Sequence, residues 1–163
     1  MRVAASKIVS REVLRQELTE RKRQGRCIVL ANGCFDMLHV GHIRYLEGAR
    51  REGDILVVGV NADSSVCNLK GPGRPVLDES ARTQVVAALR CVDYVVLFAE
   101  ANVEALLEEL RPDVHAKGTD YTADSVPERA IAARLGIRVA IVGDPKDHST
   151  RDLLESIRKA PHA

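Results

Sequence analysis

The chain has 163 residues, enough for one domain with its own hydrophobic core and too few for two of ordinary size. Hydrophobic residues make up 45% of it and charged residues 29%, a balance that excludes disordered, fibrous and membrane-spanning classes. The formal net charge is +1 and aromatic residues are 3%, which disfavours binding to nucleic acid or to an anionic membrane surface. Any bound anion must therefore be held by a local site.

The start of the chain, residues 1–7, lacks an apolar signal segment, and no stretch approaches the roughly 20 apolar residues that cross a bilayer. We therefore expect a cytoplasmic protein. The cysteines form no Cys-x-x-Cys pair, which argues against a zinc ribbon or a disulfide framework and favours reduced, mostly buried thiols. They are Cys27, Cys34, Cys67 and Cys91.

Apolar and β-branched runs alternate with helical patterns along the chain. In chain order, strands are expected over residues 27–31, 55–60, 94–98, 113–116 and 137–142. Helices are expected over residues 11–23 after a Ser10 cap, 43–51, 79–90 after an Asp78 cap, 103–110 after an Asn102 cap, and from a capping box of Ser125 with Glu128. The runs are continuous rather than alternating, which is typical of strands covered on both faces.

This order predicts an α/β fold, a Rossmann-like, doubly wound, five-stranded parallel sheet with helices on both faces. We expect a single domain over residues 1–163, with a helical extension over 1–26 and a core over 27–159. Ligands of such sheets bind outside the carboxyl ends of the strands, where the strand order reverses. The loops after the first, fourth and fifth strands are therefore the expected site.

The first of these loops carries two histidines three residues apart. His39 and His42 stand between the first strand and the next helix, with Gly41 allowing a ligand close to the backbone. Imidazoles donate hydrogen bonds to phosphate oxygens, and a helix N-terminus favours an anion by about 0.3–1 kcal/mol. A metal pair is a weaker alternative because the zincin spacing and a third ligand are absent. Structural histidines are the other alternative, and the strand-to-helix context favours the phosphate site over them.

The segment Asn32-Gly33-Cys34-Phe35-Asp36, followed by His39-Val40-Gly41-His42, resembles the signature of the cytidylyltransferase-like nucleotidyltransferases. Further motifs follow in that family's order and spacing, and the resemblance spans roughly residues 7–159. They are Leu69-Lys70-Gly71, Arg74-Pro75, Arg82, residues 87–96, Lys117-Gly118-Thr119-Asp120-Tyr121 and His148-Ser149-Thr150. Within the superfamily the chain is most similar to the adenylyltransferases of D-glycero-β-D-manno-heptose 1-phosphate, free-standing or as half of a bifunctional kinase/adenylyltransferase.

The resemblance implies transfer of AMP from ATP to that heptose 1-phosphate, giving pyrophosphate and ADP-heptose, which is used in lipopolysaccharide core assembly. A sugar phosphate oxygen attacks the α-phosphorus in line, so the protein supplies position and charge rather than a covalent nucleophile. Mg²⁺ would enter with ATP, held mainly by nucleotide phosphates and water and not by a protein ligand set. The implied partners are ATP and a sugar 1-phosphate, with no nucleic acid and no membrane, in a homodimer.

The resemblance also assigns roles to individual residues, with His39, His42 and Lys70 as the catalytic set. The implied nucleotide-binding set is Asn32, Gly33, Cys34, Phe35, Asp36, His39, Gly41, His42, Lys117, Gly118, Ser149 and Thr150. The implied substrate-binding set is Asp36, Lys70, Arg74, Arg82, Asp120 and Tyr121, and Asp120 could also hold Mg²⁺ through water. From the residues alone, Lys70 could be a solvated loop lysine, Arg82 a surface ion-pair partner and Ser149 only a helix cap.

Two residues depart from the family pattern. Thr119 stands where relatives usually carry Gly, and we expect it to narrow the loop beside the sugar. Arg151 stands where relatives carry Thr, and it could strengthen phosphate binding or face water. Two other functions stay open from the sequence: a cytidylyltransferase acting on glycerol 3-phosphate or a similar small phosphate ester, and a catalytically idle nucleotide-binding domain. The chain length predicts the adenylyltransferase unit alone, with no fused kinase.

Overall fold

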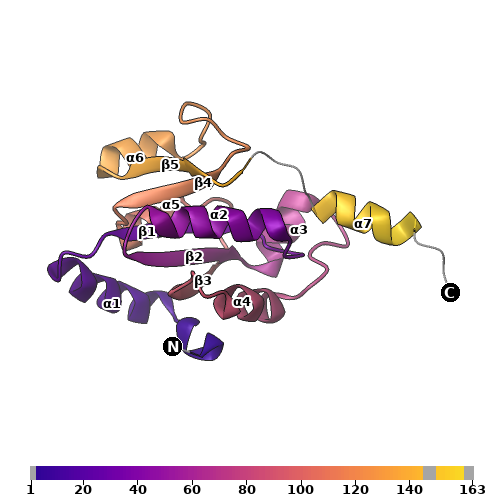
Figure 1. Ribbon diagram of the computed structural model, residues 1–163, viewed down its shortest axis with the longest axis horizontal. Coiled ribbons are helices and arrows are strands. Elements are labelled where there is room, and N and C mark those ends of the chain that lie inside the picture. Colours follow the sequence, from indigo (N-terminus) through magenta and orange to yellow (C-terminus); the bar gives the residue numbers. More distant parts are fainter. Residues whose placement is uncertain (1–2, 145–149, 160–163) are drawn as a thin grey trace.

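A five-stranded, all-parallel sheet forms the centre of the molecule (Figure 1), as the sequence predicts. The computed structural model describes residues 3–144 and 150–159. The strands lie in the order β3-β2-β1-β4-β5. They are β1 (Ile28–Gly33), β2 (Ile55–Asn61), β3 (Tyr94–Phe98), β4 (Val114–Gly118) and β5 (Arg138–Val142). The chain builds outward from β1 through β2 to β3 and then returns to β4 on the other side, so the strand order reverses between β1 and β4.

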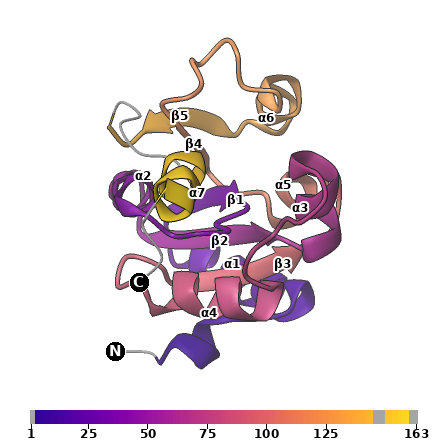
Figure 2. The ribbon, with the colours of Figure 1, turned by 90° about the vertical axis from the view of Figure 1, so that its right-hand side faces the viewer.

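Helices cover both faces of this sheet, with α2 on one side and α5 and α6 on the other (Figure 2). They are α1 (Arg11–Arg23), α2 (Val40–Arg51), α3 (Asp63–Lys70), α4 (Glu79–Ala88), α5 (Glu104–Leu110), α6 (Arg129–Leu135) and α7 (Thr150–Lys159), preceded by the 3-10 turn η1 (Ala4–Lys7). Among the described residues, none of these helices is long and apolar enough to cross a membrane.

Two hydrophobic clusters, one on each face, explain the continuous apolar runs of the strands. Along β1, Val29 and Ala31 join the cluster beneath α2 and α4, whereas Ile28 and Leu30 join the cluster beneath α1 and α5. All four side chains are fully buried. Because successive residues of a strand point to opposite faces, a strand covered on both sides must be apolar throughout.

Two of the expected helix caps are confirmed. Ser10 Oγ accepts a hydrogen bond from the Val13 N–H at 3.3 Å at the start of α1. Asp78 Oδ1 accepts one from the Ala81 N–H at 2.7 Å at the start of α4. Both helices begin where the sequence predicts, although α4 ends at Ala88 rather than at residue 90.

Of the two other expected caps, one is shifted and one does not form. The helix α5 begins at Glu104, one residue later than expected, and Asn102 Oδ1 accepts the Glu104 N–H at 3.1 Å, although Asn102 is not the N-cap residue. The capping box of Ser125 does not form, because its hydroxyl bonds within a local turn. The carboxylate of Glu128 does not bond the helix end, because it pairs with the buried Lys117. A hydrogen-bonded ion pair in the interior is stronger than a bond to a backbone N–H at a helix end.

An aspartate just before three of the strands holds the start of a neighbouring strand. In each case the side-chain Oδ2 accepts a backbone N–H at or next to the start of that neighbouring strand. The carboxylate thus gives this N–H a hydrogen-bond acceptor at the end of the sheet. The pairs are Asp54 with Cys27 (2.8 Å), Asp93 with Leu56 (2.9 Å) and Asp113 with Ile28 (2.7 Å). The bond from Cys27 is the main cause that lowers the pKa of Asp54. These contacts fix strand register at the amino edge of the sheet.

Asp113→Ala should lower the free energy of unfolding by about 1–3 kcal/mol, because the Ile28 N–H would lose its acceptor at the start of the central strand. Urea denaturation of both proteins measures the difference. Asp124→Ala is the control, since Asp124 makes an exposed ion pair with Arg129, and it should change stability by less than about 0.5 kcal/mol. Equal losses for the two variants would contradict the anchoring role.

Candidate functional site

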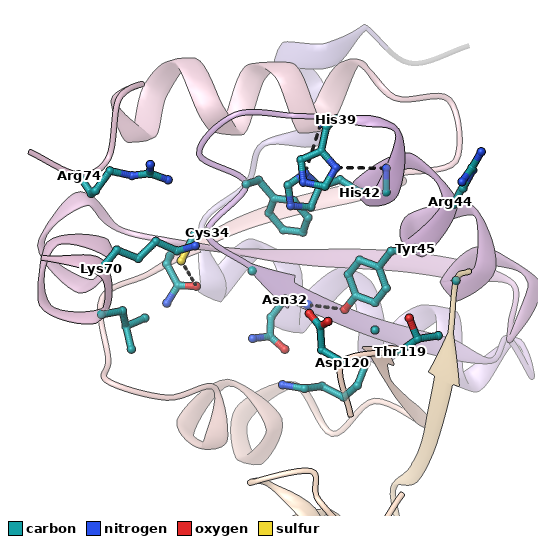
Figure 3. A pocket seen from close by; sticks show the side chains of 18 of the residues that line it. Asn32, Cys34, His39, His42, Arg44, Tyr45, Lys70, Arg74, Thr119 and Asp120 are labelled. Atoms are coloured by element: carbon teal, nitrogen blue, oxygen red, sulfur yellow. Dashed lines mark hydrogen bonds between the residues drawn. The ribbon is translucent and has the colours of Figure 1, made fainter. Parts of the chain in front are cut away.

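A cavity of about 1330 Å³ opens at the carboxyl edge of the sheet (Figure 3). The loops after β1, β4 and β5 form its walls, together with residues 69–76 and one side of α7. Single-ligand pockets usually measure about 300–1,000 Å³, so this cavity has room for two small substrates together. It lies at the loops where the strand order reverses, which is where the sequence predicts a ligand.

Most of the residues predicted for the site line this cavity. They are Asn32, Gly33, Cys34, Phe35, His39, Gly41, His42, Lys70, Arg74, Lys117, Gly118, Asp120 and Tyr121. Asp36 and Arg82 are buried behind the wall instead. Ser149 lies outside the described residues, as do the side chains of Thr150 and Arg151. The structure thus brings together segments that are far apart in the sequence.

His39 and His42 lie with their rings together at the start of α2, with centroids 3.9 Å apart. His39 is the N-cap residue, and its Nδ1 accepts the Gly41 N–H at 3.2 Å. The Nδ1 of His42 accepts the His39 N–H at 3.4 Å. A ring nitrogen that accepts from a backbone N–H carries no proton, so the proton of each neutral ring sits on Nε2. The helix start therefore presents two imidazole Nε2–H donors.

Tyr45 ties α2 to the sheet directly beneath this pair. Its hydroxyl donates to the Ala116 carbonyl of β4 at 2.8 Å and accepts the Asn32 N–H of β1 at 3.4 Å. Burial raises the pKa of Tyr45, which keeps the hydroxyl protonated. Gly143 passes so close that an added Cβ would lie 3.3 Å from the Tyr45 Cα, and its φ of +93° also requires glycine. Tyr45 carried no signal in the sequence beyond its place on the helix.

Asp36 acts inside the wall of the cavity, where its carboxylate holds the loop that follows α3. It is 2% exposed. Its Oδ1 accepts the backbone N–H groups of Val76 and Leu77 at 2.6 and 3.2 Å, and its Oδ2 lies 2.6 Å from the Arg74 Nε. Arg74 lines the cavity, so Asp36 sets the position of a cation that faces the site.

Arg82 is 1% exposed and is not the surface ion-pair partner that one interpretation of the sequence expected. Its guanidinium donates to the carbonyls of Cys34 and Leu77 at 2.6 and 3.0 Å, and to Asp63 Oδ1 at 2.8 Å. These acceptors belong to three separate segments around the cavity. The predicted substrate-binding residue thus lies behind the lining and joins the segments that form it.

Lys117 forms an ion pair with Glu128, a residue that the sequence indicated only as part of a helix cap. Its Nζ lies 3.2 and 3.4 Å from the two carboxylate oxygens of Glu128 and 4.8 Å from the centre of the Tyr121 ring. The Lys117 and Glu128 side chains are 8% and 7% exposed. A buried ammonium needs a counter-charge, and Glu128 supplies it while leaving Lys117 in the lining of the cavity.

Lys70, at the end of α3, is exposed, and in residues 3–144 and 150–159 it has no ion pair or side-chain hydrogen bond. It lies near Cys34, whose thiol pKa is raised chiefly by burial and is lowered to a smaller extent by Lys70. A protonated thiol is a poor nucleophile, so Cys34 is not suited to covalent catalysis. The lysine, on a flexible stem, is available for a bound anion.

Thr119 joins the loops after β4 and β5. Its hydroxyl donates to the Asp144 carbonyl at 2.7 Å, and the Asp144 carboxylate in turn lies 3.4 Å from the Arg44 Nε of α2. Glycine at position 119 would lack the hydroxyl that makes this link. The departure from the family pattern therefore connects two walls of the cavity.

Within the described residues, no group of three or more His, Cys, Asp or Glu side chains is placed to hold a metal ion. Asp120 contributes a carboxylate to the cavity lining. This donor set fits a magnesium ion whose ligands are mainly phosphate oxygens and water.

His115, on β4, is fully buried and was not among the predicted site residues. Its Nε2 lies 3.0 Å from Asn32 Oδ1. Burial, with a smaller contribution from the charge of Lys117, lowers the pKa of His115 to about 3. The ring is therefore neutral at pH 7.

Comparison with protein families matches residues 30–155 to the family described as cytidylyltransferase-like. The chain belongs to the cytidylyltransferase-like family. Among curated relatives, the bifunctional protein HldE of Syntrophotalea carbinolica is 46% identical over 152 residues, covering 93% of this chain and 31% of the relative. The HldE protein of Azotobacter vinelandii is 46% identical over 154 residues, covering 94% and 32%. The chain thus spans about a third of the length of these relatives.

Two solved structures share the family fold. The lipopolysaccharide core biosynthesis protein from Thermoplasma volcanium is 29% identical with a TM-score of 0.64, covering 75% of this chain and 100% of that one. The pantothenate synthetase from Thermus thermophilus has a TM-score of 0.67 at 19% identity, covering 94% of this chain and 70% of that one. The second likeness shows the fold alone.

Glu128→Gln should lower the free energy of unfolding by about 3–5 kcal/mol, because it leaves the Lys117 ammonium buried without its counter-charge. Thermal or urea denaturation measures the loss. Arg134→Gln is the matched control, because it breaks an ion pair with Glu108 in which both side chains are at least half exposed. A Glu128→Gln variant as stable as this control would show that Lys117 does not depend on the pair.

The buried His115 should make the folded state sensitive to acid. The unfolded chain binds a proton at this residue below about pH 6.5, whereas the folded chain does so only near pH 3. Folded-state stability therefore falls as the pH falls through that window, by up to about 1.4 kcal/mol per pH unit from this group. Urea denaturation from pH 7 to pH 4 measures the free energy of unfolding of wild type and of His115→Leu. This free energy should fall less steeply with falling pH in the variant than in wild type. Parallel curves for the two proteins would contradict the lowered pKa of His115.

Proposed function

We propose that this chain transfers AMP from ATP to D-glycero-β-D-manno-heptose 1-phosphate and releases ADP-heptose and pyrophosphate. The observation that carries the proposal is the pair of imidazole Nε2–H donors at the start of α2, facing a cavity with room for two substrates. The choice of sugar rests on the resemblance to the heptose 1-phosphate adenylyltransferases and on a solved relative named for lipopolysaccharide core biosynthesis.

In this reaction an oxygen of the sugar 1-phosphate attacks the α-phosphorus of ATP, and the bond from that phosphorus to the β-phosphate bridging oxygen breaks. Negative charge grows on the departing pyrophosphate. The Nε2–H groups of His39 and His42 donate to its oxygens, and the N-terminus of α2 adds its partial positive charge. These donors are fixed before the substrate arrives, because backbone N–H groups hold the opposite nitrogen of each ring.

The remaining cations divide between mobile and fixed groups. Lys70 reaches the phosphates from its flexible stem once the substrates are bound. Arg74, held by Asp36, offers a fixed guanidinium for the phosphate of the sugar. Lys117 faces the site with its charge already paired by Glu128, so we assign it hydrogen bonding rather than net charge.

Mg²⁺ would enter with ATP and neutralise phosphate charge, with phosphate oxygens and water as its main ligands and Asp120, one of the carboxylates in the cavity lining, as the residue that could hold it through water. Asp120 and Tyr121 are the residues we assign to the sugar hydroxyls. ATP as a substrate and four free cysteines agree with the cytoplasmic location that the sequence predicts. The homodimer stays a prediction.

A panel of four nucleoside triphosphates crossed with sugar and glycerol phosphates tests the function through pyrophosphate release. We expect the highest kcat/KM with ATP and D-glycero-β-D-manno-heptose 1-phosphate. Release only with CTP and glycerol 3-phosphate would make the chain a cytidylyltransferase of small phosphate esters, because the histidines bind phosphates and do not distinguish the base. No release with any pair would leave a nucleotide-binding domain without catalysis.

His42→Ala should lower kcat by about 10²-fold or more, because it removes a donor whose bond strengthens as charge develops on the leaving group. Steady-state kinetics with the best pair from the panel measures the change. Arg134→Ala, on α6 and exposed, controls for general effects of substitution, and unfolding curves check that the variant is folded. A variant with kcat intact and only KM raised would contradict a transition-state role.

A further inference from the structure

A third histidine, His115, forms a hydrogen bond beneath the cavity, away from the histidine pair at the start of α2. His115 is on β4 in register with Leu30 of the central strand, and its side chain is wholly buried. Its Nε2 lies 3.0 Å from Asn32 Oδ1. Asn32 itself is half-buried at the carboxyl end of β1 and lines the cavity (Figure 3). His115 is not in the cavity lining, and its hydrogen bond to Asn32 connects it to the site.

The hydrogen-bond inventory of the two side chains sets their orientation. An amide oxygen only accepts, so a bond to Asn32 Oδ1 requires the proton on the His115 Nε2. In the described part of the chain, the His115 Nδ1 has no hydrogen-bond partner. The opposite tautomer would bury an N–H donor without an acceptor and would turn the amide around, which costs more than leaving the weaker acceptor unpaired. The NH₂ group of Asn32 is thus the end that is directed away from His115.

We propose that His115 is a positioning residue, which holds the Asn32 carboxamide so that its NH₂ group donates to an oxygen of the bound nucleotide. Asn32 lines the same cavity as the histidine pair and the loop after β4, and Figure 3 shows it beside Asp120. A free asparagine side chain presents either its NH₂ or its oxygen, and an oxygen facing a triphosphate would be repulsive. The bond from His115 removes that second orientation. The ligand's identity rests on the proposed function.

A purely structural role for His115 predicts different results from the positioning role. As a neutral ring in the interior, it could be replaced by leucine of similar size with a change in stability only. The positioning role instead predicts that removing the donor weakens nucleotide binding, and that removing Asn32 makes His115 irrelevant to binding. Two residues that act through one interaction give non-additive effects in a double-mutant cycle.

The test compares His115→Leu, His115→Gln, Asn32→Ala and the double variant His115→Leu/Asn32→Ala by calorimetry with ATP and Mg²⁺, with no sugar phosphate present. We expect His115→Leu and Asn32→Ala each to raise the Kd for ATP about tenfold to hundredfold, the usual worth of one hydrogen bond to a charged group. The double variant should be within about twofold of Asn32→Ala. His115→Gln, whose side-chain NH₂ can replace the imidazole donor, should restore most of the affinity.

An unchanged Kd in a folded His115→Leu variant, or additive losses in the double variant, would overturn the proposal. A wild-type chain that binds ATP but turns over no sugar phosphate would overturn the proposed reaction and leave this test intact. Should the variants fail to fold, the wild-type ¹⁵N spectrum decides at pH 7. It must show a buried histidine protonated on Nε2, and a ring protonated on Nδ1 would overturn the proposal.

Discussion

The site depends on a requirement of helix geometry: the first N–H groups of α2 need acceptors outside the helix. Serine or aspartate usually supplies them, but here His39 and His42 do so through Nδ1. The same bonds that complete the helix also place a proton on each Nε2. Tyr45 then fixes the helix against β1 and β4. The bonds that cap the helix thus also direct two Nε2–H donors to the cavity.

The electrostatics of the cavity follow from how its cations are compensated. Lys117 is paired with Glu128, Arg74 with Asp36 and Arg44 with Asp144, so the protein can keep these charges close together without strong mutual repulsion. Hydrogen-bond donors and Lys70 supply the attraction for an anion. With this arrangement, a chain with a formal net charge of only +1 can carry the proposed triphosphate site.

The sequence predicted what depends on local pattern and missed what depends on distant partners. The strands followed from apolar runs, and Ser10 and Asp78 cap helices because their acceptors lie three residues away from the N–H groups they bind. Ser125 with Glu128 had the same local pattern but forms no capping box, because the Glu128 carboxylate pairs with the buried Lys117 and not with the helix end. Arg82 had no local signal for burial. Its acceptors come from three segments that only the folded chain brings together.

The aspartates that hold the strand starts lie at the opposite edge of the sheet from the cavity. Within residues 3–144 and 150–159, the loops that line the cavity take no part in these aspartate contacts, which hold the strand register. A loop after β4 or β5 can then change its length or residues during evolution while the strands keep their pairing. Substrate range can diverge in such a family by exchange of loops on a constant frame, and the same separation makes the cavity edge a practical place for engineering new specificities.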